Sequence, residues 1–371
     1  MTSFWKPEHA RDARRSISVQ IPVIESVNRE GLQSGRIYWD MWPIQTRSGH
    51  IALIKGRELW MALGAPDRAD SSIRHFEAKI YLLERQGTRW VDLGPVLPEF
   101  DVDYEREWSG SAIIEGDNLS LYITGAGVAQ KAGGYQQRLF EAHATIGDNG
   151  LPINWSKPVL SVEGYGEHYM PADAHEGEAG KIKAFRDPAF FKDPADGAEY
   201  LVFSGSLAGS SSDFNGVIGI AKRAGERWDL LPPLISAEGV NNELERAHVV
   251  FHEGRYYAFW VTQSHTFAPD LRQAPTGLYG MVADSLFGEY HPLNGSGLVL
   301  ATPESEPLQS YSWFVSSELL VSSFVDFYGL KGSTLPSDTA AANQFFGGVP
   351  APLLKLQIDA DRCELAEMVQ A

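Results

Sequence analysis

The sequence predicts an all-β protein built from many short strands. Its 371 residues include 36 Gly, 21 Pro and 11% aromatic residues, and short apolar runs alternate with turns rich in Gly and Asp. The strands continue without a linker or a break in composition, so we expect a single domain over residues 1–371. The repeated order of strand, turn and strand is typical of a propeller of four-stranded blades. A sandwich is the alternative, but this length would require two of them.

Individual elements follow from the apolar runs and the turns between them. Before the first strand, only residues 3–17 could form a helix, and we expect the short N-terminal segment 1–30 to pack on the strands. The strand pairs expected in chain order are 51–54 with 59–63, 78–84 with 90–93, 111–114 with 119–124, 200–203 with 217–221, and 248–251 with 255–262.

Charge and cysteine content exclude several classes of function. The formal net charge of -17 argues against nucleic acid and anionic membrane surfaces as partners, because both require an excess of Lys and Arg. Cys363 is the single cysteine, so an intrachain disulfide cannot form. No Cys/His spacing indicates zinc, and we expect neither a metal nor a cofactor. A neutral substrate such as a sugar is compatible with this charge.

The N-terminus predicts the compartment. Residues 1–10 contain charges and a proline where a signal peptide would have its apolar core. No apolar stretch of about 18 residues, the length of a membrane-spanning helix, is present. We therefore expect a cytoplasmic protein, unless a route that needs no signal peptide exports it. The oligomeric state stays open.

Three short acidic motifs indicate the chemistry. They are 39–43 (WDMWP), 185–188 (FRDP) and 243–246 (ELER), and each places a carboxylate beside aromatic residues, beside an arginine, or both. Desolvating a carboxylate in such a setting is costly unless the group has a function. Cleavage of a glycosidic bond needs one carboxyl to attack or stabilise the anomeric carbon and another to protonate the leaving oxygen. We interpret the chain as a carbohydrate-active enzyme.

Each motif also has a purely structural interpretation. Asp40 could cap a turn while its tryptophans fill the core, and Asp187 could be a salt-bridged turn residue. Glu243 and Glu245 are expected on the same face of one strand, where like charges raise one pKa and suit a general acid. Arg246 could moderate this repulsion. The alternative for the pair is a solvated edge strand.

One further cluster of ionisable residues is present in the loop 168–178, which holds two His and several acids. Its Gly, Ala and Pro content and the lack of regular ligand spacing favour a solvated loop over a metal site.

The three acidic motifs, in this order, resemble glycoside hydrolase family 68, which comprises levansucrases, inulosucrases and bacterial β-fructofuranosidases. Further segments are similar to Gram-negative members of that family, namely 107–112 (EWSGSA), 231–234 (LPPL), 239–241 (GVN), 277–280 (GLYG), 292–300 (PLNGSGLVL) and 311–312 (YS). The resemblance extends from Ser3 to Ile358. A motif such as Arg-Asp-Pro is weak alone, whereas the ordered set is specific.

The resemblance implies a five-bladed β-propeller with a central funnel-shaped active site. It implies that Asp40 is the nucleophile, Asp187 the transition-state stabiliser and Glu245 the general acid/base. The fructosyl subsite would be lined by Trp39, Trp108, Ser109 and Arg186, and glucose binding or acid orientation would involve Glu243, Arg246 and Tyr311. The implied activity is retaining cleavage of sucrose, with fructose passed to water or to sugar acceptors to form fructo-oligosaccharides or levan.

Several positions depart from the family pattern. Gln263 stands where the family usually has His or Arg, while Trp313 and Ala247 replace a usual His and Pro. Calcium, which Gram-positive relatives bind, is not expected, because Asn242 and Lys181 occupy positions of acidic ligands. The substitutions affect the expected glucose and acceptor side, so they bear on product choice rather than on sucrose cleavage.

Two other functions are compatible with parts of the pattern. A non-catalytic propeller that binds sugars would keep the tryptophans but would not need three acids. An inverting five-bladed glycosidase would use a water-activating base, with its carboxyls further apart than those of a retaining enzyme.

Overall fold

The structure, a computed structural model, describes residues 2–68, 70–128, 134–172 and 180–369, and 50% of the chain lies in β-strands. The all-β prediction is confirmed. Within the described ranges there are two short α-helices, α1 (Pro7–Asp12) and α2 (Thr339–Asn343). The first lies in the stretch expected to hold a helix, whereas the second was not predicted. None of the helices in these ranges is long and apolar enough to cross a membrane.

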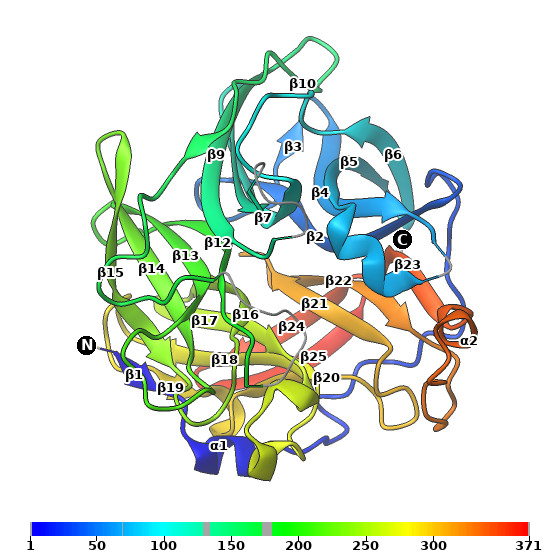
Figure 1. Cartoon of the computed structure of the whole chain (residues 1–371), viewed down its shortest axis with the longest axis vertical. Helices are drawn as coiled ribbons and strands as arrows, with labels where there is room; N and C mark the ends of the chain where they lie inside the picture. The colour runs from blue at the N-terminus through cyan, green and yellow to red at the C-terminus, as the bar shows by residue number, and fades with distance from the viewer. Residues whose placement is uncertain (1, 69, 129–133, 173–179, 370–371) are drawn as a thin grey trace.

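The strands form four hydrogen-bonded sheets arranged around a common centre (Figure 1). The largest sheet consists of two antiparallel groups. The first group is β2 (Arg36–Thr46), β3 (Leu53–Ile54), β4 (Arg57–Pro66), β5 (Lys79–Gln86) and β6 (Arg89–Pro95). The second group is β7 (Arg106–Glu115), β8 (Asn118–Ala126), β9 (Gln137–Ile146), β10 (Pro152–Ile153) and β11 (Val159–Leu160). The two groups join where the ends of β2 and β7 pair in parallel, from Ile44–Ala112 to Thr46–Ile114.

The other three sheets have five strands each. One contains β12 (Phe185–Lys192), β13 (Glu199–Ser206), β14 (Gly216–Ala224), β15 (Arg227–Ser236) and the N-terminal β1 (Ser3–Phe4). The next contains β16 (Glu245–His252), β17 (Arg255–Thr262), β18 (Gly277–Ala283), β19 (His291–Pro292) and β20 (Leu298–Ala301). The last contains β21 (Ser310–Val315), β22 (Leu320–Phe327), β23 (Phe346–Pro350), β24 (Leu354–Asp359) and β25 (Arg362–Met368).

Four of the five strand pairs expected from the sequence are present. The pairs β5–β6, β7–β8, β13–β14 and β16–β17 are antiparallel and include the predicted residues. The pairing of 51–54 with 59–63 is wrong, because Leu53 and Ile54 pair with residues 57–58 while 59–63 pair with β5 and β2. The four confirmed pairs are local, and their turns carry Gly, Asp or Asn, which accounts for their visibility in the sequence.

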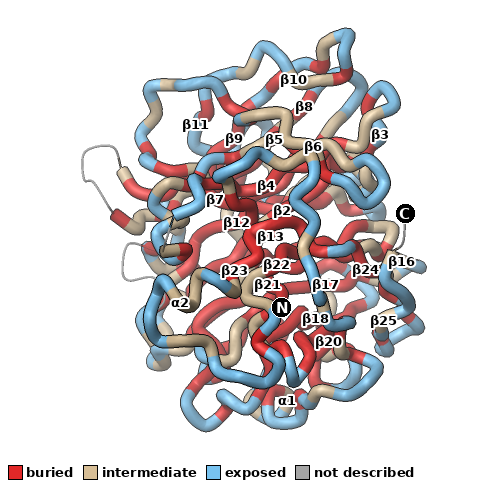
Figure 2. The backbone as a smooth tube through the Cα atoms, turned by 90° about the vertical axis from the view of Figure 1, so that its right-hand side faces the viewer, coloured by how far each residue is buried: buried red, intermediate tan, exposed pale blue. Residues whose placement is uncertain are grey.

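The first long strands of the five antiparallel groups form a closed ring. Strand β2 packs against β7, β7 against β12, β12 against β16, β16 against β21, and β21 against β2. We refer to these five as the ring strands. They are largely buried, as the interior of Figure 2 shows, because each has neighbours on both sides. Side chains from all five groups therefore meet at the centre.

The N-terminal segment connects two of the sheets. Strand β1 runs parallel to β15, and Gln20 forms an isolated parallel bridge with Ala301. Between them, Trp5 is 1% exposed, donates a hydrogen bond from Nε1 to the carbonyl of Ser296 at 2.9 Å, and makes an edge contact with Trp260. The buried indole holds this segment against the sheets.

Candidate active site

Four of the five ring strands contain a bulge near their first residues, and each bulge holds a residue with positive φ. These residues are Asp40 (45°), Asp187 (59°), Arg246 (53°) and Ser312 (57°). The fifth strand, β7, shifts register at Ser109. A bulge redirects side chains out of the regular alternation, and positive φ outside glycine is strained and concentrates at functional sites. The repeated bulges therefore mark a functional centre inside the ring.

Asp40 lies within β2 and not in a turn, so the structural interpretation of this residue as a turn cap is wrong. The tryptophans on either side, Trp39 and Trp42, are 1% and 0% exposed. Oδ2 of Asp40 accepts a hydrogen bond from Oγ of Ser109 at 2.6 Å. This bond joins two ring strands and fixes the orientation of the carboxylate toward the centre.

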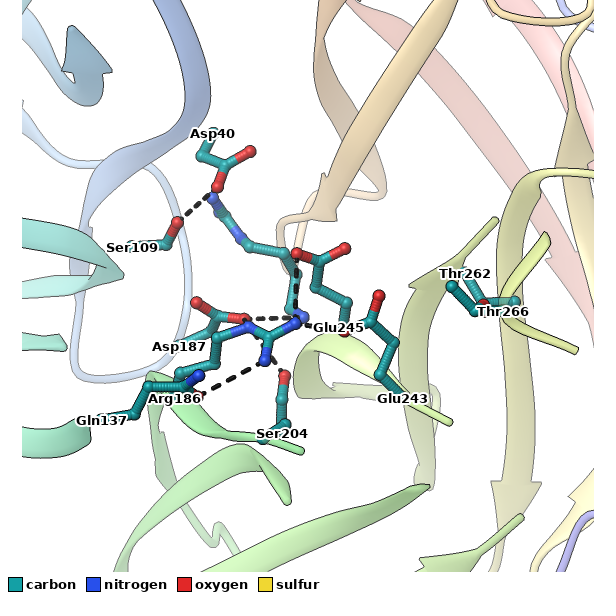
Figure 3. Close-up of polar contacts among 12 residues, drawn as sticks. Asp40, Ser109, Gln137, Arg186, Asp187, Ser204, Glu243, Glu245, Thr262 and Thr266 are labelled. Atoms are coloured by element: carbon teal, nitrogen blue, oxygen red, sulfur yellow. Dashed lines mark hydrogen bonds and ion pairs between the residues drawn. The ribbon is translucent and has the colours of Figure 1, made fainter. Parts of the chain in front are cut away.

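Arg186 lies at the meeting point of three carboxyl groups (Figure 3). Its Nε is 3.5 Å from Oδ2 of Asp187, and its Nη2 is 3.6 Å from Oε1 of Glu245. The same Nη2 forms a close ion pair with Oε2 of Glu243. Gln137 accepts a longer hydrogen bond, 3.4 Å, from Nη1. One guanidinium therefore holds three carboxyl groups of the predicted site together.

Asp187 is 5% exposed and is salt-bridged to Arg186, as the structural interpretation had it, but it lies on β12 and is not a turn residue. Its Oδ2 accepts hydrogen bonds from the hydroxyl of Ser204 at 3.2 Å and from the backbone N–H of Arg246 at 3.3 Å. Burial nevertheless raises the pKa of Asp187 to about 6, since the desolvation of the charged form outweighs the attraction of Arg186 and Arg246.

The two glutamates do not share a strand, contrary to the prediction. Strand β16 begins at Glu245, and Glu243 lies in the preceding turn, where its backbone N–H bonds to the side-chain oxygen of Asn241 at 3.0 Å. This turn brings both carboxyls to Arg186. Glu243 is 4% exposed, so a solvated edge strand is excluded as well.

Glu245 has the strongest shift of these carboxyl groups. Burial raises its pKa well above the ordinary value, and the charge of Glu243 raises it further. The phenol of Tyr311 donates a hydrogen bond to Oε2 of Glu245. The side chain of Gln263 hydrogen-bonds the same phenol. A carboxyl that keeps its proton near neutral pH is suited to general acid catalysis.

Arg246, which the resemblance assigns to glucose binding or to orientation of the acid, contacts the strand that carries Asp40. It is 3% exposed, and its Nη2 donates to the backbone carbonyl of Met41 at 3.1 Å. Its guanidinium lies 5.4 Å from the ring centre of Trp42 and 5.8 Å from that of Phe314. In this position Arg246 supports the strand that carries Asp40.

Trp39 and Trp108 are both buried, so neither is an open stacking platform. His75, which the sequence did not single out, lies between them, with ring centres 5.8 Å from Trp39 and 6.3 Å from Trp108. Its backbone carbonyl accepts a hydrogen bond from Nε1 of Trp108 at 3.1 Å. The 3-10 helix η1 (Ser71–Phe76) therefore packs on both tryptophans.

Two other hydroxyl residues belong to the site: Thr124 was missed, and Ser204 stood out in the sequence only because the family usually has Glu there. Oγ1 of Thr124 donates to the backbone carbonyl of Ser109 at 3.1 Å and accepts from the backbone N–H of Asp187 at 2.8 Å. Ser204 bonds to Asp187 directly. Both residues precede a glycine at the end of an apolar strand, in LYITG (121–125) and LVFSG (201–205), and this shared pattern could have identified them.

Within the ranges that the structure describes, no three His, Cys, Asp or Glu side chains lie close enough together to hold a metal ion. Residues 173–179 of the loop considered as a metal site lie outside those ranges. Asn242 is fully buried; its Oδ1 accepts from the backbone N–H of Gly180, and its Nδ2 donates to the carbonyl of Asp213 at 2.9 Å. A carboxylate could not donate that second bond.

Comparison with known proteins assigns the family. A family sequence model described as levansucrase/invertase matches residues 6–216 and 210–370, which is nearly the whole chain. The chain belongs to this family. Levansucrase Lscbeta of Pseudomonas syringae pv. actinidiae is 30% identical over 378 residues, covering 89% of this chain and 82% of the relative. The resemblance to glycoside hydrolase family 68 is thereby confirmed.

Solved structures of family members have the same fold. The inulosucrase of Halalkalicoccus jeotgali bound to kestose has a TM-score of 0.90 and 36% identity, with 100% of this chain and 96% of that chain covered. The β-fructofuranosidase of Microbacterium saccharophilum K-1 has a TM-score of 0.83, covering 100% of this chain and 85% of that chain, and its 23% identity supports a shared fold alone.

Proposed function

We propose that this protein is a retaining enzyme that cleaves sucrose and passes the fructosyl unit to water or to a sugar acceptor. The observation that carries the proposal is the meeting of Asp187, Glu243 and Glu245 at Arg186, inside the ring that also presents Asp40. The relatives are named levansucrase, inulosucrase and β-fructofuranosidase, and the inulosucrase holds kestose. We therefore take sucrose and fructo-oligosaccharides as the substrates of this chain.

For the architecture, we infer a single five-bladed propeller over residues 1–371, with the N-terminal segment packed on it. The hydrogen-bond pattern has four sheets because β2 and β7 pair at their ends. That parallel contact spans only three residue pairs, whereas every pairing within each group of strands is antiparallel except that of β1 with β15. The closed ring of five strands supports counting β2–β6 and β7–β11 as separate blades.

In the first step, Asp40 attacks the anomeric carbon of the fructosyl unit while Glu245 protonates the glycosidic oxygen, and glucose leaves. Asp40 is held for this attack by Ser109 and by the strand that Arg246 supports. The raised pKa of Glu245 keeps the proton on this carboxyl until the leaving oxygen needs it. The product is an ester between Asp40 and fructose.

In the second step, the ionised Glu245 takes a proton from water or from an acceptor hydroxyl, which attacks the fructosyl ester. Two inversions leave the configuration of the anomeric carbon unchanged. Asp187 stabilises the positive charge that develops on the sugar in both transition states, and Arg186 keeps Asp187 and Glu245 in place.

The remaining predicted residues divide into two groups. Trp39, Trp108, Ser109 and Arg186 surround the fructosyl unit. Glu243, Tyr311 and Gln263 lie around Glu245, where glucose departs and an acceptor enters. Arg246 acts through Asp40 and Asp187 as a positioning residue.

The decisive experiment is incubation of the purified protein with sucrose, followed by quantification of free glucose and free fructose. Equal amounts indicate hydrolysis, and an excess of glucose indicates transfer. With methanol as acceptor, a retaining enzyme forms methyl β-fructofuranoside, whereas the α-anomer would indicate inversion. Binding of sucrose without any cleavage would leave a non-catalytic sugar-binding propeller.

A further inference from the structure

A fifth carboxyl group, that of Asp326, lies near the predicted centre and has no role in the mechanism above. Asp326 is at the end of β22, and its backbone N–H donates to the carbonyl of Gln309 at 2.9 Å. The preceding residue, Val325, pairs with Ser310 beside Tyr311, so Asp326 lies at the end of the sheet where Tyr311 reaches Glu245. The register of β22 against β23 also shifts at Asp326.

The side chain of Asp326 has an unused hydrogen-bonding position. Its Oδ1 is buried and accepts no hydrogen bond from any residue that the structure describes. Burial raises the pKa of Asp326 to about 6, with the carboxylate of Asp40 raising it further and Arg74 lowering it. Strand β22 packs against β2, so Asp326 lies on a neighbour of the strand that carries Asp40. A buried carboxylate oxygen without a donor is unfavourable unless a ligand supplies that donor.

Arg74 lies near both Asp326 and Trp39, one of the two buried tryptophans of the site. Arg74 belongs to η1, and its Nη1 donates to the carbonyl of Ser71 at 2.9 Å. Its guanidinium lies 5.7 Å from the ring centre of Trp39 and 5.2 Å from that of Phe346 on β23. A carboxylate, a guanidinium and an aromatic ring thus come together next to the nucleophile, which is a combination that suits a polyhydroxylated ligand.

We propose that Asp326 is a further substrate-binding residue, whose carboxylate accepts a hydrogen bond from a hydroxyl of the fructosyl unit held next to Asp40. This inference rests on the proposed function, because it assumes that a fructosyl unit occupies the space next to Asp40. A sugar hydroxyl supplies the donor that Oδ1 lacks, and a charge-assisted bond of this kind adds both affinity and orientation.

The test combines a variant of the protein with variants of the substrate. Asp326→Asn keeps the shape of the side chain and removes its charge, and we expect kcat/KM for sucrose to fall about tenfold. Kinetics are then measured with sucrose analogues that each lack one hydroxyl of the fructosyl unit. For one analogue, the loss seen with the wild type should largely disappear in Asp326→Asn, since the bond is already missing.

A matched control is available at the other end of the same strand. Glu318 precedes β22, its Oε1 accepts from the backbone N–H of Ile51 at 2.7 Å, and its Oε2 is buried without a hydrogen bond from the described residues. Glu318→Gln should leave kcat/KM and the analogue pattern unchanged. If Asp326→Asn does not fold, as judged by thermal unfolding, Asp326→Glu is measured in the same way, because its displaced carboxylate should also remove the effect of that one hydroxyl.

Two failures are distinguishable. If the wild type cleaves no sucrose, the proposed function is wrong. If the wild type cleaves sucrose and every analogue has the same relative effect in wild type and in the Asp326 variant, this inference alone is overturned.

Discussion

The phenol of Tyr311 donates a hydrogen bond to Oε2 of Glu245, a carboxyl whose pKa burial raises well above the ordinary value. The two influences oppose each other. Burial favours the protonated form, which is needed to expel glucose, whereas a hydrogen bond donated to the carboxylate favours the ionised form, which is needed to activate the acceptor. The pKa of Glu245 therefore lies between the high value that favours protonation of the leaving glucose and the low value that favours activation of the acceptor.

Replacement of Tyr311 by phenylalanine should shift the pH dependence of sucrose cleavage. Without the donated bond, the ionised form of Glu245 is less stable and its pKa rises. The alkaline limb of kcat/KM, which follows the loss of the acid's proton, should move to higher pH by up to about one unit. A pH–rate profile of the wild type and Tyr311→Phe measures this shift. A limb that stays in place or moves to lower pH would contradict the assigned pair.

Asp40→Asn should abolish turnover and leave the fold intact. An amide of the same shape cannot form the ester with fructose, so we expect kcat to fall by at least about 10⁴-fold. Circular dichroism and thermal unfolding check the fold. Ser109→Ala is the milder comparison, because it keeps the nucleophile and removes one hydroxyl that bonds to Asp40 at 2.6 Å, and about a tenfold loss is expected. Substantial sucrose cleavage by Asp40→Asn would remove this residue from its proposed role.

Glu245→Gln should lose most of its activity toward sucrose, because glucose leaves only when its oxygen is protonated. A fructosyl donor whose leaving group needs no proton should be cleaved with a much smaller loss, provided that formation of the fructosyl ester limits the rate. The measurement compares kcat/KM for both donors in wild type and variant. The proposed acid role would fail if both donors lost the same factor.

The fold was predictable as far as it depends on local pairing. The hairpin β7–β8 follows from apolar runs around the turn at 115–118, and β16–β17 from those around 252–254. The parallel contact between Ile44 and Ala112 and the closure of the ring were not predictable in this way, because they join residues far apart in sequence. Helix α2 has no apolar periodicity, and within the described residues none of its side chains is buried.

The site was predictable where a charge stands out in an apolar strand, as Asp40 does between Trp39 and Trp42. It was not predictable where backbone geometry decides. Glu243 and Glu245 are two residues apart, which suggested one strand face, but the turn at Asn241 places Glu243 before the strand. Asp326 could not be singled out from the sequence, because its place beside the strand of Asp40 comes from the packing of β22 against β2.

Asp187→Asn should remove a loss of folding stability that the wild type undergoes as the pH rises from about 4 to about 6. The folded pKa of about 6 lies above the unfolded value of 3.8, so the stability that protonation contributes is fully present below about pH 4 and is lost as the pH rises through 6. The loss is at most about 3 kcal/mol, and the carboxylate's attraction to Arg186 and Arg246 is already included in that shift. In the variant, residue 187 carries no charge at any pH, so it neither undergoes this loss of stability nor attracts Arg186 and Arg246. The variant's melting temperature, relative to wild type, should increase from pH 4 to pH 7. If the difference in melting temperature between variant and wild type is the same at pH 4 and at pH 7, the raised pKa of Asp187 is contradicted.

Gln263→His should increase the fraction of fructose that is transferred instead of hydrolysed. The side chain of Gln263 hydrogen-bonds Tyr311, which bonds to Glu245, so it lies on the side where an acceptor must enter. An uncharged amide binds an acceptor hydroxyl less strongly than a cationic imidazolium, and water competes more easily for the fructosyl ester. We expect the wild type to release mainly fructose and short fructo-oligosaccharides. In the variant, the ratio of free glucose to free fructose should increase at an almost unchanged rate of sucrose consumption, with Gln263→Asn as a control that keeps an amide. High-molecular-weight levan as the main wild-type product, or an unchanged ratio in the variant, would refute this role for Gln263.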